Sequence, residues 1–271
     1  MRNEGRPDTS ELLRSLYAAD GGVPSAFSAR VSDYAAYRPH YPDELFDYLT
    51  SKCPPTDELI VVDVGSGTGL LTRGLLRCGY RTIAVEPSHE MRAVAERDFA
   101  SRPRFRSLEG TAESLPLDTQ SVDLVAVAQA LQWFDVQRAR AEFLRVLKPS
   151  GQLAFIWNDR VRGDPLRGAV DQLLSGFGET KHAALKAQDD RSSVYRFFGT
   201  SCPPARSFPN EQRLNEDEFT GLVFSGSFVP LRTSDEGKRL VIELRSLFSL
   251  FERDGRVVVR YRTVVFFGRP S

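Results

Sequence analysis

Five residues in the first third of the chain have the types and spacing needed to bind a molecule that carries a nucleoside. They are Asp63, Gly65, Gly67, Gly69 and Glu86. Glycines that alternate directly after a strand allow a tight turn, in which backbone N–H groups approach a ligand closely. Glu86 lies 21 residues after Gly65, the length of a helix plus a strand. Its carboxylate is therefore expected beside the glycine turn, where it can accept hydrogen bonds from the hydroxyls of a ribose.

A strand, a turn and a helix are expected to position these residues. Leu59–Val64 is almost unbroken in apolar character, which is typical of a strand buried on both faces of a parallel sheet. Leu71 and Leu75 stand four residues apart after the turn, and Gly79 marks the end of a helix there. Thr82–Glu86 then predicts a second strand that ends in a carboxylate.

The spacing of the glycines distinguishes between two classes of cofactor. A dinucleotide-binding fold has the pattern G-x-G-x-x-G, whereas the glycines here fall at 65, 67 and 69 behind an acidic residue. This pattern resembles motif I of the class I S-adenosylmethionine-dependent methyltransferases, in which the acidic residue receives the ammonium of the methionine part. The resemblance implies that Asp63, the three glycines and Glu86 bind S-adenosyl-L-methionine.

Three more segments resemble a small-molecule branch of the type-11 methyltransferases, the branch that includes trans-aconitate methyltransferase. They are the entry segment at 34–42, the AESLPL loop at 112–117 and the AQALQWF segment at 128–134. The resemblance and the position of the last segment at a strand end imply further cofactor-binding residues: Tyr37, Arg38, Ala112, Glu113, Gln129 and Ala130. Relatives often have His where this chain has Gln132, and an amide cannot act as an acid or base.

Aromatic and hydroxyl side chains near the predicted strand ends are candidates for binding the methyl acceptor: Tyr34, Trp133, Trp157, Ser225 and Ser227. Packing of the aromatics and turn formation by the serines are the structural alternatives. Methyl transfer is an in-line displacement, so positioning and exclusion of water matter more than a dedicated base. No catalytic residue is assigned; the candidates are Arg38, His40 and Gln132. With three histidines in the chain, an acceptor that is already ionised is favoured, and Arg38 is the first choice to bind its carboxylate.

Composition narrows the class of partner. The chain has 36 basic and 36 acidic residues, so no overall field attracts nucleic acid or a membrane surface, and a small molecule is the expected partner. The three cysteines are far apart, which predicts neither a disulfide framework nor a metal site. The absence of a signal-peptide pattern and of a bilayer-spanning apolar run predicts a cytoplasmic protein.

The predicted fold class is α/β, a Rossmann-like seven-stranded, mostly parallel sheet with an antiparallel last strand and a helical cap inserted after the fifth strand. The predicted divisions are a flexible N-terminal arm at 1–26, a cofactor-binding core with its lid at 27–158, the helical cap at 159–205 and the completing strands and helices at 206–271. Two alternatives to a methyltransferase stay open at this point: a binding protein of the same fold that has lost or altered the activity, and an NAD-dependent oxidoreductase.

Overall fold

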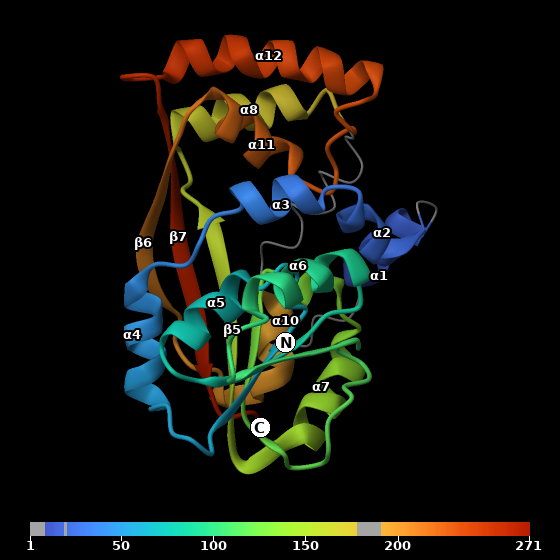
Figure 1. Ribbon diagram of the computed structural model, residues 1–271, viewed down its shortest axis with the longest axis vertical. Coiled ribbons are helices and arrows are strands. Elements are labelled where there is room, and N and C mark those ends of the chain that lie inside the picture. The colour runs from blue at the N-terminus through green and yellow to red at the C-terminus, as the bar shows by residue number, and fades with distance from the viewer. Residues whose placement is uncertain (1–8, 19–20, 178–190) are drawn as a thin grey trace.

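A seven-stranded sheet is the central element of the computed structural model, which describes residues 9–18, 21–177 and 191–271 (Figure 1). The strand order is β3-β2-β1-β4-β5-β7-β6. The strands are β1 (Ile60–Val64), β2 (Arg81–Val85), β3 (Phe105–Leu108), β4 (Val122–Ala128), β5 (Leu147–Arg160), β6 (Arg206–Leu214) and β7 (Val257–Gly268). Every neighbouring pair is parallel except the two that involve β7. The predicted α/β fold with an antiparallel last strand is therefore confirmed.

Helices cover both faces of the sheet and also form a separate layer above its carboxyl edge (Figure 1). The described α-helices are α1 (Thr9–Ala18), α2 (Gly22–Ser28), α3 (Val31–Tyr37), α4 (Asp43–Lys52), α5 (Leu70–Arg77), α6 (His89–Phe99), α7 (Val136–Val146), α8 (Pro165–Leu174), α10 (Ser192–Phe198), α11 (Glu216–Phe224) and α12 (Asp235–Phe251). Two 3-10 turns are η1 (Leu131–Trp133) and η3 (Gly199–Ser201). None of the helices in the described ranges is long and apolar enough to span a membrane.

The alternation of side chains along each strand divides the core into two layers. Val61 of β1 packs with Leu45 of α4 and Leu75 of α5. Its neighbour Val62 points to the opposite face and packs with Phe143 of α7. Apolar residues at consecutive positions are therefore buried by different helices, which explains the continuous apolar run in the sequence.

The helical cap differs from the predicted insertion at 159–205. It is assembled from α8, α11 and α12, which share one apolar cluster that includes Val170, Phe219 and Leu244. By contrast, α10 lies in the main core, where Phe197 and Phe198 are fully buried. Apolar residues on a helix show that one face is buried but not which surface buries it, so the sequence could not separate these two cases.

The N-terminal segment also differs from the predicted flexible arm over its described residues. Leu13 and Tyr17 of α1 are fully buried. Tyr17 lies edge-on to Trp133 with ring centroids 5.3 Å apart, and its hydroxyl shares a 2.8 Å hydrogen bond with the hydroxyl of Ser227. These contacts place α1 beside η1 at the carboxyl edge of the sheet.

Phe197→Ala tests the assignment of α10 to the main core. The Phe197 ring centroid lies 4.7 Å from that of Phe155 and 5.5 Å from that of Phe143, so truncation should lower the free energy of unfolding by about 3 to 5 kcal/mol. Tyr195→Ala on the same helix is the control, because that side chain is 56% exposed and should change stability by less than about 0.5 kcal/mol. Equal effects in urea denaturation would place α10 outside the core.

Candidate functional site

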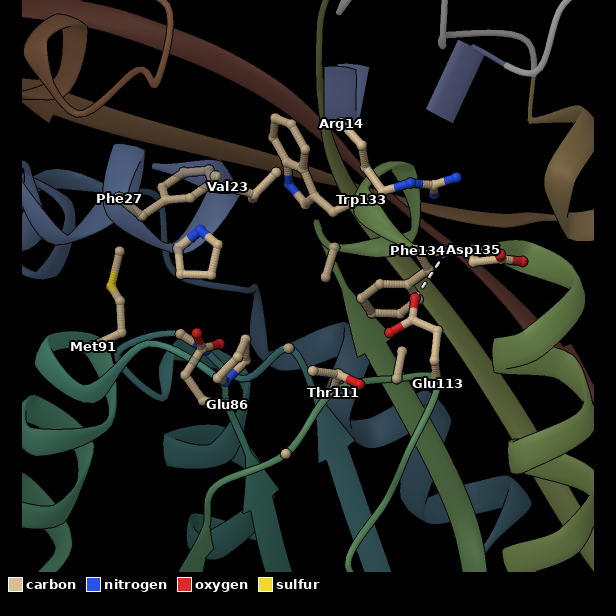
Figure 2. Close-up of a pocket in the computed structure, with 18 of the residues that line it drawn as sticks. Arg14, Val23, Phe27, Glu86, Met91, Thr111, Glu113, Trp133, Phe134 and Asp135 are labelled. Carbon is tan, nitrogen blue, oxygen red and sulfur yellow. Dashed lines mark hydrogen bonds between the residues drawn. The ribbon is translucent and has the colours of Figure 1, made fainter. Parts of the chain in front are cut away.

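A cavity of about 530 Å³ lies where β1, β2 and β4 end (Figure 2). Its size is typical of a site for a small molecule. The glycine turn and Glu86 form one side, and the segments that follow β3 and β4 form another. Helices α1, α2 and α3 cover it with Arg14, Val23, Phe27 and Tyr34. The cavity is thus at the sheet edge where ligands bind in open α/β folds.

The glycine turn presents its backbone to this cavity. Gly65 has φ +68°, and a Cβ there would lie 2.7 Å from the Cβ of Ala130, so packing as well as conformation requires glycine. Gly67 has φ +57° and lines the cavity, and the nearest atom to its added Cβ would be a Tyr34 ring carbon at 3.8 Å. A side chain at Gly67 would therefore occupy ligand space instead of clashing with protein.

Asp63 lies behind the glycine turn and is only 1% exposed. Its Oδ2 accepts a 2.7 Å hydrogen bond from the Thr72 hydroxyl, while Oδ1 is buried without a hydrogen-bond partner among the described residues. Burial raises the pKa of the carboxyl to about 7, against the Thr72 hydrogen bonds, which lower it. An unpartnered acceptor of this kind fits a cationic donor such as an ammonium group.

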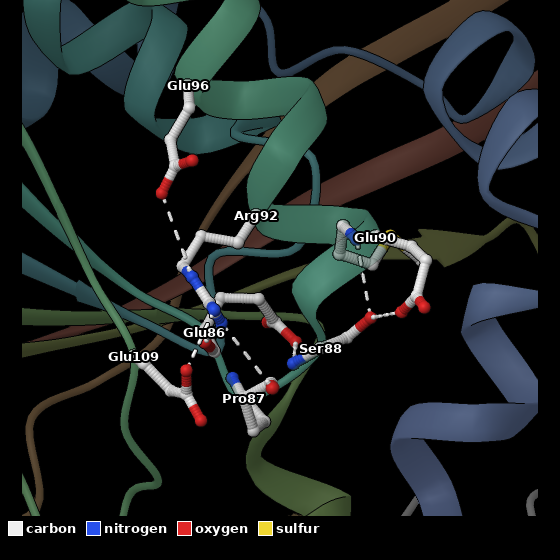
Figure 3. A network of polar contacts seen from close by, with 8 residues as sticks. Glu86, Pro87, Ser88, Glu90, Arg92, Glu96 and Glu109 are labelled. Atoms are coloured by element: carbon white, nitrogen blue, oxygen red, sulfur yellow. Dashed lines mark hydrogen bonds and ion pairs between the residues drawn. The ribbon is translucent and has the colours of Figure 1, made fainter.

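Glu86 connects the ends of β1 and β2. Its Oε2 accepts from the Gly67 N–H and its Oε1 from the Ser88 N–H, both at 2.9 Å. Burial raises the pKa of Glu86, although both backbone hydrogen bonds act to lower it. The Arg92 guanidinium holds the same corner by donating to the Glu86 carbonyl at 2.9 Å and to the Glu109 carboxylate at 2.9 Å (Figure 3). This network fixes a carboxylate at the cavity side.

The start of the AESLPL loop lines the far side of the cavity. Ala112 is buried and, with Glu113, belongs to the lining. The Glu113 carboxylate accepts a 2.8 Å hydrogen bond from the Asp135 N–H, at the N-cap of α7 (Figure 2). One side chain therefore joins the loop after β3 to the segment after β4.

The segment after β4 brings three predicted residues to the cavity, Gln129, Ala130 and Trp133. Gln129 has φ +57°, a backbone conformation that a non-glycine residue adopts at a cost. Its N–H donates to the Ile156 carbonyl at 3.0 Å, which holds this bend in place. Gln132 is not among the lining residues, and its amide donates instead to the Gln129 carbonyl at 2.8 Å.

Several predicted residues are used in packing and do not line this cavity. Tyr37 packs so closely on α11 that a Cβ at Gly221 would lie 2.1 Å from its ring. Trp157 belongs to the main core, because strand alternation turns it toward α10 and turns Asn158 the other way. Ser225 donates to the Leu222 carbonyl at 2.6 Å, so the structural alternative for the serines holds there.

Arg38 and His40 follow α3 outside the lining of this cavity. The Arg38 guanidinium carbon lies 5.0 Å from the Tyr34 ring centroid, and its Nη2 donates to the Ser225 carbonyl at 3.0 Å. Its buried Nε has no hydrogen-bond partner in the described parts of the chain. The pKa of His40 is lowered, first by partial burial and then by the charge of Arg73.

The sequence did not indicate the cavity residues contributed by α1, α2 and α6. Arg14, Phe27 and Met91 all line the cavity. The only available signal was the spacing of Leu13 and Tyr17, which marks one buried face of a short helix. Such spacing does not reveal that the opposite edge of this helix reaches a ligand site.

Residues 62–155 match a family model described as a methyltransferase domain. An uncharacterized methyltransferase of Mycobacterium tuberculosis is 44% identical over 135 residues, which are 50% of this chain and 53% of that protein. The match thus spans about half the length of that curated relative. An uncharacterized methyltransferase-like protein of Schizosaccharomyces pombe is 29% identical over 89% of this chain and 93% of its own.

A solved structure agrees with these matches. A candidate type II methyltransferase from Anaeromyxobacter dehalogenans superposes with a TM-score of 0.62 at 29% identity, covering 86% of this chain and 98% of that one. The fold is that of the class I methyltransferases. Residues 62–155 thus match a methyltransferase domain, the class of protein that the motifs of the sequence resemble.

The residues at the cavity fit the methyl donor of this family. The unpartnered Asp63 Oδ1 suits its ammonium, the free space at Gly67 admits its chain, and the Glu86 carboxylate lies at the cavity wall. These are the residues that the spacing of the sequence singled out.

Gly67→Leu tests whether ligand space begins at this residue. We expect at least about tenfold weaker binding of S-adenosylmethionine, which corresponds to about 1.4 kcal/mol. Gly163→Leu is the matched control, because Gly163 has φ +77° with open space around it, and both variants bear a similar backbone strain of roughly 1 to 3 kcal/mol. Calorimetric titration that finds equal affinities for the two variants would contradict this geometry.

Proposed function

We propose that the protein transfers a methyl group from S-adenosylmethionine to a carboxylate oxygen of a small molecule. The observation that carries the proposal is that the glycine turn and Glu86 line one cavity of suitable size, with the unpartnered Oδ1 of Asp63 behind the turn. The match of residues 62–155 to a methyltransferase domain supports the reaction class, and the chemistry of the surrounding side chains supports the acceptor.

Four parts of the chain would hold the donor. Asp63 would receive its ammonium, and Glu86 its ribose hydroxyls. Ala112 and Glu113 would frame its adenine. Arg38, which has an unpartnered Nε and lies over Tyr34, would bind the carboxylate of its amino-acid part. In this arrangement Arg38 serves the donor, which is one of the two roles predicted from the sequence, and not the acceptor.

A carboxylate acceptor agrees with a cavity lining whose carboxylates, Glu86, Glu113 and Asp135, all accept hydrogen bonds from backbone N–H groups. None of the described residues that line the cavity is a histidine. Burial raises the pKa of the Tyr34 phenol, which keeps this hydroxyl neutral at ordinary pH. When bound, S-adenosylmethionine supplies a methyl group whose carbon–sulfur bond breaks, with its electron pair left on sulfur, as a carboxylate oxygen forms the new carbon–oxygen bond. The acceptor oxygen loses no proton, so no base is required.

The N-terminal helices would exclude water from this step. Phe27 and Trp133 meet edge-on with ring centroids 5.6 Å apart, and Val23 lies beside them over the cavity (Figure 2). An apolar cover lowers the local dielectric and restrains the reacting groups. A Pectobacterium atrosepticum relative, 37% identical over 108 residues and 42% of its length, is named malonyl-[acyl-carrier protein] O-methyltransferase, which is consistent with oxygen as the acceptor atom.

The affinity for S-adenosylmethionine should depend on pH through Asp63. Its carboxyl has a raised pKa of about 7, so below pH 7 binding of the ammonium requires loss of a proton, and the affinity should fall roughly tenfold per pH unit well below 7. Above about pH 8 the ammonium itself deprotonates and the affinity should fall again. Asp63→Asn should bind S-adenosylmethionine more weakly, and its affinity should no longer fall below pH 7. If calorimetry finds the same fall in the variant, Asp63 is excluded from the ammonium site.

Methyl transfer itself is tested with methyl-labelled S-adenosylmethionine and a panel of carboxylic acids, amines and phenols. We expect label in methyl esters, which hydrolyse in base, and a rate that is independent of pH between about 6 and 9 at saturating donor, because a carboxylate is ionised throughout. Label in amines or phenols would refute the proposed acceptor. Donor binding without transfer to any acceptor would instead identify a binding protein.

A further inference from the structure

Beyond the cavity, the carboxyl end of β5, the amino-terminal half of β7 and the neighbouring part of β6 carry a polar face. Cross-strand pairing puts Arg160, Tyr261 and Asn210 in one row. Because side chains two residues apart share a face of a strand, Arg160 lies on the same side of β5 as Asn158. We call Asn158, Arg160, Asn210 and Tyr261 the β5–β7 polar face.

The segment that follows α3 lies across this face. Asn158 donates to the Pro39 and His40 carbonyls at 3.4 and 3.3 Å, and Asn210 donates to the His40 carbonyl at 2.7 Å. Gln212 donates to the Tyr37 carbonyl at 3.0 Å and accepts from the Tyr261 hydroxyl at 2.9 Å. These contacts bring Arg38 next to the face that carries Arg160.

Among the described residues, two arginines, Arg38 and Arg167, and one carboxylate, Asp171, act on the charge of Arg160. Within the described residues, the nearest carboxylate to Arg160 is Asp171, 3.9 Å from Nη1, and Arg167 of α8 lies closer to the same carboxylate at 3.4 Å. Burial lowers the pKa of Arg160, the charges of Arg38 and Arg167 lower it further, and Tyr261 and Asp171 oppose them. Burying like charges without full compensation is costly, so this arrangement is suited to an added anion.

The Arg160 guanidinium is also available for such a contact. Among the described residues, no side chain or carbonyl accepts a hydrogen bond from this guanidinium, and 31% of the side chain is exposed. Arg30, Arg145 and Arg92 differ, because each donates several hydrogen bonds to backbone carbonyls or carboxylates. Arg160 is therefore not explained by a structural role of that kind.

The distance from the cavity suits a small acceptor. Gln129 lines the cavity and its amide donates to the Asn158 carbonyl at 3.4 Å. Arg160 follows two residues later on the same strand, which places its Cα roughly 7 Å farther along. This separation is a few bonds long, which is the length of a small molecule that carries two carboxylates.

We propose that Arg160 is a specificity-determining residue, which binds a second, non-reacting carboxylate of the methyl acceptor. The inference rests on the proposed function and adds to it that the acceptor carries at least two carboxylates. A guanidinium binds a carboxylate through two parallel hydrogen bonds, which occupy both oxygens and reduce their nucleophilicity. The carboxylate at Arg160 therefore positions the acceptor without reacting, and the carboxylate that is methylated lies at the cavity.

The direct test is calorimetric titration of malonate, succinate, glutarate and citrate into the protein saturated with S-adenosylhomocysteine. We expect at least one of the four to bind, and Arg160→Met to weaken its binding about 30-fold or more, with partial recovery in Arg160→Lys. The affinity for S-adenosylhomocysteine should change less than about twofold. Arg262→Met is the control, because Arg262 is exposed and its β7 position places it on the opposite face.

The outcomes separate this inference from the proposed function. Binding of none of the four acids, or equal binding to the wild type and Arg160→Met, overturns the role of Arg160 whether or not methyl transfer occurs. Loss of binding together with a raised melting temperature supports a ligand role, because removing an uncompensated buried charge relieves strain. A lowered melting temperature with unchanged acid binding would assign Arg160 to structure. Failure of methyl transfer to any carboxylate, with acid binding intact, refutes only the proposed reaction.

Discussion

The carboxylate of Glu86 is the contact on which the cofactor edge of the sheet depends. It accepts backbone hydrogen bonds from both Gly67 and Ser88, so one side chain ties the turn after β1 to the start of α6 after β2. A buried carboxylate is costly unless donors surround it, and here the backbone supplies them. The same carboxylate lines the cavity, so the group that shapes the turn is also presented to the ligand.

The sheet and the residues at its edge could be predicted because they depend on local sequence. The apolar run before Asp63 specifies a strand, and the alternating glycines specify a turn. The interval to Glu86 has the length of a helix and a second strand. Parallel strands then bring their carboxyl ends together at one edge of the sheet. Ala112, Glu113, Gln129 and Ala130 were found for the same reason, because they directly follow strands.

The remaining site residues could not be predicted because they depend on packing between distant segments. Trp157 and Tyr37 have the composition of pocket residues, yet each fills an apolar cluster whose partners come from elsewhere in the chain. Arg14 reaches the cavity only because Leu13 and Tyr17 hold α1 beside Trp133. Arg160 is one arginine among many in the sequence, and only the pairing of β5 with β7 and the position of Arg38 set it apart.

Calorimetric titration of Glu86→Gln with S-adenosylmethionine tests the central claim most directly. The amide retains one acceptor oxygen but cannot accept from both backbone N–H groups and the ribose at once, so we expect affinity to fall by at least about tenfold, or 1.4 kcal/mol. Glu96→Gln is the control, because the Glu96 side chain, which pairs with Arg92, is 51% exposed. This variant should bind S-adenosylmethionine as the wild type does. Wild-type affinity in folded Glu86→Gln would show that the donor binds elsewhere.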